Sequence, residues 1–278
     1  MAAEPPHPRA GRFGVAGYPV GHSRSPGIHA AAYAELGIDA DYQRLPIPPE
    51  LFAPTVRALP GSGFKGINVT IPHKLAALEV ADERSHAANM IGAANTLTFT
   101  DDGRIRADNT DAPGMFAALP SDPAGREALV IGAGGTARAA VYALSRAGAR
   151  VSIWNRTAAR AAEIAEAFSV THARELVVAE RAQIVVNATA VGMRVDETVE
   201  SVLEDLPIGP AALADSLLVD FVYRQGGSPF AEIARARGGA VVDGGELLVR
   251  QAGLSFELWF GRPAPLAAMR DALAKSLG

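Results

Sequence analysis

The chain has 278 residues, of which 49% are hydrophobic and 20% charged, with a formal net charge of −4 at pH 7 and no cysteine. The composition is typical of a globular protein, and the length allows one large domain or two ordinary ones. It excludes disulfides, thiolate metal ligands and a cysteine nucleophile, and the acidic balance gives no reason to expect nucleic-acid or membrane partners. The chain starts without a signal-peptide pattern and lacks an apolar run of the ~20 residues that a membrane span needs, so we expect a cytoplasmic protein.

Predicted strands and helices alternate in the first half of the chain. Residues 1–11 are rich in proline and charge, and we expect a disordered tail there. Ser25 is expected to cap a helix that has Pro26 at its first position. A hairpin is expected at the turn Asp101-Asp102-Gly103. Further helices are predicted at residues 49–59 and after Pro72. The predicted strands are residues 13–16, 42–47, 66–71, 96–99 and 104–107.

A domain boundary is predicted at residues 120–123, where two prolines lie among polar residues. The strands predicted after it are residues 128–131, 150–154, 184–187, 217–220 and 240–242. The helices predicted after it are residues 136–147, 246–260 and 265–277. Short alternating units of this kind predict an α/β fold with parallel sheets and right-handed crossovers.

A glycine-rich turn joins the strand at 128–131 to the next helix. Gly132, Gly134 and Ala137 occupy the three positions of a G-x-G-x-x-A pattern. The first glycine allows a sharp turn, the second lets the backbone approach a pyrophosphate, and the small third residue allows close packing of helix and strand. The helix N-terminus offers free N–H groups to the phosphates. The pattern predicts dinucleotide binding, and the alternative is a tight turn without a ligand.

The end of the second strand indicates which dinucleotide binds. NAD-binding proteins usually place a carboxylate there, on the ribose 2′-hydroxyl, whereas this chain has Asn155, Arg156 and Thr157. No carboxylate repels a 2′-phosphate, and the Arg156 guanidinium can donate several hydrogen bonds to one. Arg160 lies four residues on, at the spacing of one helix face. We therefore predict NADP rather than NAD, with a solvated surface arginine as the alternative for Arg156.

Small polar residues gather near strand ends in the first half, where open α/β folds bind ligands. They lie in residues 21–26, 68–74, 95–96 and 108–111. Hydroxyls and amides at such positions suit a carboxylated, hydroxylated small molecule. Each also has a structural interpretation: Ser25 and Asp111 can cap helices, Lys74 can be a solvated lysine, and Asn95 can be a turn residue.

Taken in order, these segments resemble the motifs of the shikimate dehydrogenase family. The motifs are G-x-P-x-x-H-S-x-S-P at residues 17–26, N-V-T-x-P-x-K at 68–74, I-G-A-x-N-T at 91–96, N-T-D at 109–111, G-A-G-G at 132–135, N-R-T at 155–157, N-A-T-x-x-G-M at 187–193 and L-V-x-Q-A at 248–252. They span almost the whole chain and are far more specific than the glycine turn alone.

The resemblance implies a fold and an activity. The activity is an NADP-dependent reduction of 3-dehydroshikimate to shikimate in aromatic amino-acid (chorismate) biosynthesis, by a monomer or homodimer. The fold has an α/β substrate domain at residues 12–119 and a doubly wound, Rossmann-type NADP domain at 124–245. The C-terminal helices, residues 246–278, return to the first domain.

The resemblance also implies roles for individual residues. The substrate would contact Ser23 and Ser25 through its carboxylate, and Thr70, Asn95, Asp111 and Gln251 through its ring hydroxyls, with Tyr223 nearby. Lys74 and Asp111 would form the catalytic pair. The cofactor would be held by Gly132, Ala133, Gly134, Gly135, Thr136, Asn155, Arg156, Thr157, Thr189 and Gly245. No metal is expected.

The reaction itself requires a proton donor, because hydride addition to a ketone leaves a negatively charged oxygen. Our hypothesis is that Lys74 protonates this oxygen in reduction and removes the hydroxyl proton in oxidation. Burial would lower the pKa of a lysine, and the neighbouring Asp111 would raise it. His22 and His73 are the competing donors, because an ordinary histidine pKa suits the task.

One position departs from the family pattern. Gly245 keeps a family glycine, but Glu246 stands where the family usually has a methionine near the nicotinamide. A carboxylate beside the nicotinamide would favour the oxidised ring. Alternatively, Glu246 turns to solvent at a helix start, where an acidic residue is favourable, and we prefer this interpretation.

Three other functions compete with the leading one. A quinate/shikimate or aminoshikimate dehydrogenase often uses NAD, which Arg156 argues against. A non-catalytic, ligand-sensing relative has no need of Lys74 and Asp111. Another two-domain NADP enzyme, such as a methylenetetrahydrofolate dehydrogenase, would share the glycine turn but not the serine pair.

Overall fold

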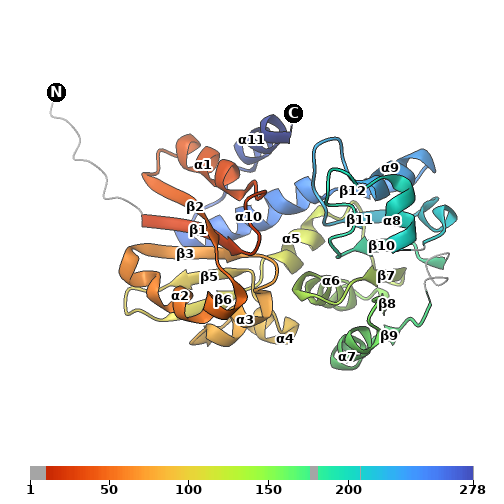
Figure 1. Ribbon diagram of the computed structural model, residues 1–278, viewed down its shortest axis with the longest axis horizontal. Helices are drawn as coiled ribbons and strands as arrows, with labels where there is room; N and C mark the ends of the chain where they lie inside the picture. The colour runs from red at the N-terminus through yellow and green to blue at the C-terminus, as the bar shows by residue number, and fades with distance from the viewer. Residues whose placement is uncertain (1–10, 176–180, 207, 278) are drawn as a thin grey trace. The chain divides into compact units, whose positions relative to one another are not determined.

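The structure is a computed structural model that describes residues 11–175, 181–206 and 208–277. These residues form two compact units, each with its own sheet (Figure 1). Unit 1 runs to Thr110 and resumes at Ala252–Ser276, and unit 2 contains Asp111–Gln251 and Leu277. The compact units therefore change over after Thr110 and after Gln251, whereas the functional domains expected from sequence change over at residues 120–123 and after Gly245. Of the expected tail at residues 1–11, only Gly11 lies within the described residues.

Unit 1 is built on a six-stranded sheet with the order β2-β1-β3-β5-β6-β4. The strands are β1 (Gly11–Gly17), β2 (Ala40–Pro46), β3 (Phe64–Val69), β4 (Glu83–Arg84), β5 (Thr96–Phe99) and β6 (Ile105–Asp108). The expected parallel pairing is found for β1 with β2 and β3 and for β4 with β6, whereas β5 runs antiparallel to both β3 and β6. The predicted hairpin at Gly103 is confirmed and accounts for the antiparallel pairing of β5 with β6.

Helices cover both faces of this sheet (Figure 1). The helices of unit 1 are α1 (Ser25–Glu35), α2 (Phe52–Ala58), α3 (Lys74–Val80), α4 (His86–Ile91), the second part of α10 (Gly244–Phe260), α11 (Leu266–Leu277), and the short 3₁₀ turns η1 (Pro49–Leu51) and η2 (Pro60–Ser62). A hydrophobic core forms between α2, α3 and the sheet. On the other face, aromatic rings fill the layer: the Phe13 centroid lies 4.9 Å from that of Trp259 and 5.1 Å from that of Phe260.

Unit 2 contains a wholly parallel sheet with the order β12-β11-β10-β7-β8-β9. The strands are β7 (Glu127–Ile131), β8 (Arg150–Trp154), β9 (Thr171–His172), β10 (Ile184–Asn187), β11 (Leu217–Asp220) and β12 (Ala240–Val242). From β7 the chain builds the sheet in one direction to β9 and then returns to β10 on the other side of β7. This is the strand order of the doubly wound Rossmann fold, with its ligand crevice between β7 and β10.

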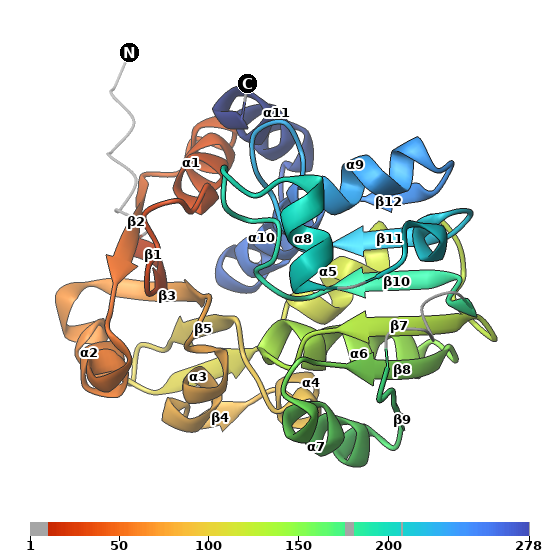
Figure 2. The same ribbon diagram turned by 45° about the vertical axis from the view of Figure 1, so that its right-hand side comes forward.

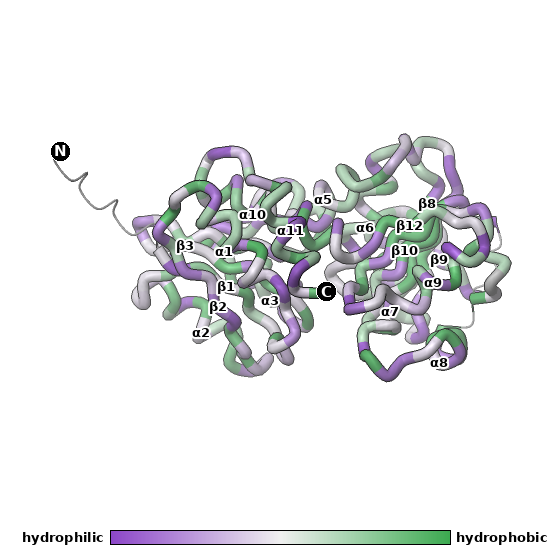
Figure 3. The backbone as a smooth tube through the Cα atoms, turned by 90° about the horizontal axis from the view of Figure 1, so that it is seen from above, coloured by the Kyte–Doolittle hydropathy of each residue, from purple (hydrophilic) through white to green (hydrophobic). Residues whose placement is uncertain are grey.

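The core of unit 2 is built around strands that are buried along their full length. Residues 184–187 and 217–220 are buried along their full length, as expected for parallel strands covered on both faces. Figure 3 shows the matching hydrophobic stretch near β10 and β12. The covering helices are α5 (Asp111–Ala118), α6 (Gly135–Arg146), α7 (Ala158–Phe168), α8 (Val199–Asp205), α9 (Pro229–Ala236) and the 3₁₀ turn η4 (Pro210–Leu213), which surround the sheet in Figure 2.

Most predicted elements are confirmed, several with identical limits: β5, β8, β10, β11 and β12. The expected capping role of Ser25 is wrong. Arg24 takes the N-cap position of α1, and the Ser25 backbone N–H instead donates to Ser23 Oγ at 3.3 Å. Across the part of the chain that the structure describes, we find no helix with the length and apolarity of a membrane span.

His29 of α1 makes the stability of unit 1 depend on pH. Its side chain is fully buried and stacks on Tyr42, with ring centroids 4.2 Å apart. Burial lowers the pKa of His29 from 6.5 to about 3, against a smaller opposing effect of the Asn68 side chain. Below pH 6.5 the unfolded chain therefore takes up a proton that the folded protein does not, so stability falls as the pH falls towards 3.

We expect His29→Phe, which stacks but cannot titrate, to remove this dependence. On lowering the pH from 7.5 to 4.5, the wild type should lose about 2.5 kcal/mol more unfolding free energy than the variant. Urea unfolding at both pH values measures the difference, and His86→Phe at an exposed position is the matched control. Equal acid sensitivity of wild type and His29→Phe would contradict the assignment.

Candidate active site

The predicted substrate residues of unit 1 meet at one edge of its sheet. Because β5 is antiparallel to β3, its first residue, Thr96, pairs with Asn68 near the end of β3. Thr70 follows β3, Asn95 precedes β5, and the Ser23 turn follows β1. The topology thus brings together segments that are far apart in the chain.

The turn that carries Ser23 and Ser25 is held by backbone and side-chain hydrogen bonds. The Ser23 N–H donates to the Val20 carbonyl at 3.1 Å, and both serines are only 4% exposed. From β2, Arg44 donates from Nε and Nη2 to the Ser23 carbonyl, at 3.1 and 2.7 Å. Sequence reasoning missed Arg44, because an arginine on a strand carries no local signal for a partner in a distant turn.

A buried hydrogen-bond network lies behind these residues. Asn95 Oδ1 accepts from the Thr110 N–H at 2.7 Å, and Asn95 Nδ2 donates to Thr110 Oγ1 at 2.9 Å. Asn68 Nδ2 donates to Ser255 Oγ at 2.8 Å, and Ser255 Oγ also bonds Thr96 Oγ1 at 2.8 Å. Asn95 is thus oriented by protein partners, and Thr110, the residue before Asp111, is held in one position.

Lys74 is the first residue of α3, and its backbone is tied to the same network. Its carbonyl accepts from the Ala94 N–H at 2.8 Å, beside Asn95, and its side chain is half-buried. The two competing histidines differ in surroundings. His73 is buried, donates from Nε2 to the Ile47 carbonyl at 2.7 Å and stacks on Phe52, so its ring serves packing. His22 is exposed, and burial of part of its ring together with the charges of Arg24 and Arg44 lowers its pKa.

Asp111 and Gln251 belong to unit 2, on helices that approach closely. Asp111 begins α5 and is 5% exposed. One turn later, a Cβ on Gly114 would lie 3.0 Å from the backbone nitrogen of Gln251 in α10, so glycine permits the near-contact of the two helices. Gln251 Nε2 donates to the Leu248 carbonyl at 2.9 Å. Lys74 lies in unit 1, and its pairing with Asp111 stays a prediction.

The glycine turn after β7 fits a dinucleotide. Gly132 has φ +118°, and a Cβ there would lie 2.8 Å from the Ala188 carbonyl oxygen, so only glycine lets the turn pass β10. A Cβ on Gly134 would meet nothing within 4 Å, which leaves open space at the N-terminus of α6. Ala133, Gly135 and Thr136 complete the turn, and Thr189 Oγ1 donates to Asn187 Oδ1 at 2.7 Å on the other side of the crevice. The open N-terminus is a suitable place for phosphate groups.

Two exposed cations lie between the end of β8 and the first turn of α7. Arg156 and Arg160 are exposed at the start of α7. Asn155 Nδ2 donates to the Thr157 carbonyl at 3.0 Å, which shapes the turn after β8. The guanidinium groups therefore remain accessible to solvent and to an anion.

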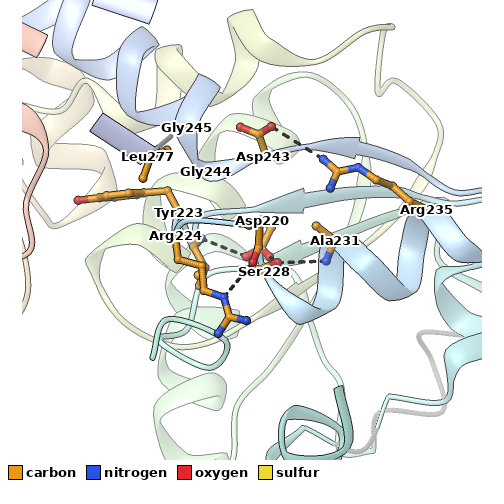
Figure 4. Close-up of a pocket in the computed structure, with 13 residues that line it drawn as sticks. Asp220, Tyr223, Arg224, Ser228, Ala231, Arg235, Asp243, Gly244, Gly245 and Leu277 are labelled. Atoms are coloured by element: carbon orange, nitrogen blue, oxygen red, sulfur yellow. Dashed lines mark hydrogen bonds and ion pairs between the residues drawn. The ribbon is translucent and has the colours of Figure 1, made fainter. Parts of the chain in front are cut away.

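Tyr223 lies in a cavity of about 340 Å³ within unit 2, together with Gly244 and Gly245. Figure 4 shows the Tyr223 side chain extending towards Leu277, away from Arg235. At the cavity floor, Asp220 Oδ1 accepts from Asn187 Nδ2 and from the Val222 N–H, both at 3.0 Å, and Oδ2 accepts from Ser228 Oγ. Burial raises the pKa of Asp220 to about 6, although these three donors oppose the shift.

Asp220 was not among the predicted site residues, although an acidic residue at the end of a buried strand is a visible signal in the sequence. It joins the segments that carry Thr189 and Tyr223. Glu246 lies in the first turn of α10, where its Oε1 accepts from Arg250 Nε at 2.6 Å and its side chain is 29% exposed. In the described part of the chain, no group of three or more His, Cys, Asp or Glu side chains could hold a metal ion.

Comparisons with known protein families match segments from the start, the middle and the end of the chain. Residues 15–97 match the shikimate dehydrogenase substrate binding domain, residues 118–205 match the shikimate / quinate 5-dehydrogenase family, and residues 245–274 match the shikimate 5′-dehydrogenase C-terminal domain. A shikimate dehydrogenase (NADP(+)) of Methylobacterium radiotolerans is 44% identical over 277 residues, covering 95% of this chain and 96% of the relative. The chain belongs to the shikimate dehydrogenase family.

Solved structures extend this similarity to the fold. Shikimate 5-dehydrogenase from Thermus thermophilus, crystallised with NADP(H) and shikimate, is 37% identical and superimposes with a TM-score of 0.84, covering 95% of this chain and 99% of that one. The ligand-free 5-ketofructose reductase of a Gluconobacter species is 26% identical with a TM-score of 0.77, covering 95% and 98%. The fold therefore also occurs in a protein named for another activity, so activity has to be argued from the site.

Proposed function

We propose that this protein is an NADP-dependent shikimate dehydrogenase, which interconverts 3-dehydroshikimate and shikimate in aromatic amino-acid biosynthesis. The observation that carries the proposal is the 44% identity to a shikimate dehydrogenase (NADP(+)) over 95% of this chain, which has the substrate and cofactor motifs given above in order, apart from Glu246. A cytoplasmic enzyme, monomeric or homodimeric and without nucleic-acid or membrane partners, fits the same proposal.

The substrate would bind at the carboxyl edge of the unit 1 sheet. Ser23 and Ser25 would donate their hydroxyl hydrogens to the substrate carboxylate. Thr70, Asn95, Asp111 and Gln251 would bond the ring hydroxyls, with Tyr223 beside them. Buried, pre-oriented polar groups suit this task, because their hydrogen bonds need little reorganisation on binding.

Lys74 and Asp111 would carry out the proton transfer. Bound NADPH supplies the hydride. As the carbonyl oxygen of the substrate gains negative charge, Lys74 Nζ would donate a proton to it, and in oxidation the neutral amine would take the hydroxyl proton back. The Asp111 carboxylate would orient the ammonium group and stabilise its charge. His22 is exposed and His73 is committed to the Ile47 carbonyl, which supports the choice of lysine.

The cofactor would be held by unit 2. The pyrophosphate would lie on the turn of Gly132, Ala133, Gly134, Gly135 and Thr136, at the N-terminus of α6. Asn155, Arg156 and Thr157 would bind the 2′-phosphate, and Thr189 and Gly245 would line the nicotinamide side. The engagement of Glu246 by Arg250 supports the interpretation that this carboxylate does not face the nicotinamide.

An absorbance assay tests the activity and the choice of cofactor together. Shikimate and quinate are each offered with NADP⁺ and NAD⁺, and we expect the highest kcat/KM for shikimate with NADP⁺. Arg156→Gln should lower kcat/KM for NADP⁺ by about tenfold or more, and not that for NAD⁺, because a charge-assisted bond to the 2′-phosphate is lost. Arg150→Gln, exposed at the other end of β8, is the control. Fast turnover of quinate with NAD⁺ alone would instead support the quinate alternative.

The proton-transfer roles predict a large loss of turnover with retained binding. Lys74→Ala and Asp111→Asn should each lower kcat by ~10²–10⁴-fold, the usual contribution of a general acid–base. Lys65→Ala is a matched control, because Lys65 is an exposed lysine of the same unit, paired with Asp101. Steady-state rates at saturating substrates provide the measurement, and near wild-type rates in either variant would refute the pairing.

A further inference from the structure

An arginine on a neighbouring strand, Arg44 of β2, donates hydrogen bonds to the turn that carries Ser23 and Ser25. Arg44 lies on β2, in register with Val15 of β1, and its guanidinium group donates to the turn that follows β1. Two donors of one guanidinium, Nε at 3.1 Å and Nη2 at 2.7 Å, share the Ser23 carbonyl. A planar fork that makes two bonds to one oxygen fixes that oxygen in direction as well as distance.

The internal bonds of the turn transmit this restraint to the two hydroxyl groups. The Ser23 N–H is bound to Val20, and Ser23 Oγ accepts from the Ser25 N–H at 3.3 Å. With its carbonyl also bound by Arg44, the Ser23 residue is anchored at its N–H, its side chain and its carbonyl. Both serines are 4% exposed, so they have little room to adopt other positions.

Arg44 also brings positive charge to the turn. Burial lowers the pKa of His22, the residue before Ser23, and the charges of Arg24 and Arg44 lower it further, so both guanidinium groups act within electrostatic range of the turn. An anionic ligand bound by the two serines would be attracted by the same charges. Geometry and charge therefore favour the same occupant, a carboxylate.

We propose that Arg44 is a positioning residue that sets the affinity of the Ser23–Ser25 turn for the substrate carboxylate. This rests on the proposed function, because it takes the carboxylated substrate from there. Arg44 acts through the Ser23 carbonyl and not on the reacting atoms, so its effect falls on substrate KM and leaves the chemical step unchanged.

The test is steady-state oxidation of shikimate by three variants. R44Q should raise KM for shikimate about tenfold, with kcat within about twofold and KM for NADP⁺ unchanged, because a charge-assisted fork is lost. R44K keeps the charge but not the fork, so its KM should rise by about three- to fivefold. R57Q, at an exposed arginine of the same unit that pairs with Asp82 at 3.8 Å, should behave as the wild type.

Changing the ionic strength distinguishes the effect of the positive charge at position 44 from the effect of the two guanidinium hydrogen bonds. Raising the salt concentration should lower kcat/KM for shikimate more in the wild type and R44K than in R44Q, because only the first two keep the attracting charge. Thermal unfolding of each variant shows whether the variant is folded, independently of its turnover. If R44Q does not fold, the values for R44K decide.

The outcomes separate the two proposals. A wild type that does not oxidise shikimate overturns the proposed function, and this inference with it. A wild type that does, together with an unchanged shikimate KM in R44Q and R44K, overturns only the role of Arg44. Equal losses in kcat and in both KM values would also overturn it, because they indicate general damage to the fold.

Discussion

The buried hydrogen-bond network at the carboxyl edge of the unit 1 sheet is the constraint on which the candidate active site depends. Asn68, Asn95, Thr96, Thr110 and Ser255 are each at most 4% exposed, so their polar groups need hydrogen-bond partners within the protein. They bond to one another and, through Asn68, to Tyr42. The network joins β3, β5, the end of β6 and α10. Its consequence is that the chain leaves β6 in one fixed position, and the residue that follows Thr110 is Asp111.

In unit 2, backbone geometry positions the glycine turn, as the buried hydrogen-bond network positions the candidate residues of unit 1. The strand order places β7 beside β10, and the close passage of Gly132 past the Ala188 carbonyl is possible only without a side chain. The turn is therefore tight, and the N-terminus of α6 stays open at Gly134. Asp220 then ties the ends of β10 and β11 together through Asn187 and Val222. Rigid strand ends carry the candidate loops in both units, so the loops of each unit are pre-organised by their own sheet.

The sequence predicted the fold wherever the signal was local. Buried apolar runs such as residues 184–187 and the Gly103 turn specify their own conformation, and both are as predicted. The Ser25 cap was wrong because Ser23 supplies the local hydrogen bond instead. The two-residue strands β4 and β9 were missed because pairing with neighbours defines them, and a short segment has no period of its own.

The candidate site residues were also predictable only where the sequence signal was local. Ser23, Asn95 and the glycine turn lie in short motifs, whose spacing is readable from sequence. Ser255 is 187 residues from its partner Asn68, and Arg44 meets Ser23 only because β2 pairs with β1. Such partners are brought together by strand order, so no local pattern could indicate them. The supporting residues of the site, unlike the motif residues, had to come from the structure.

The buried network is proposed to position Lys74 and Asp111 for proton transfer. The most direct measurement is kcat for shikimate oxidation, at saturating shikimate and NADP⁺, in Thr110→Val and Thr110→Ser. Valine keeps the shape of threonine but removes the oxygen that accepts from Asn95, and serine keeps that oxygen. We predict that kcat falls about tenfold or more in Thr110→Val, since a hydrogen bond of the buried Asn95 amide is lost, and stays within about threefold in Thr110→Ser. Equal kcat values in the two variants would contradict it.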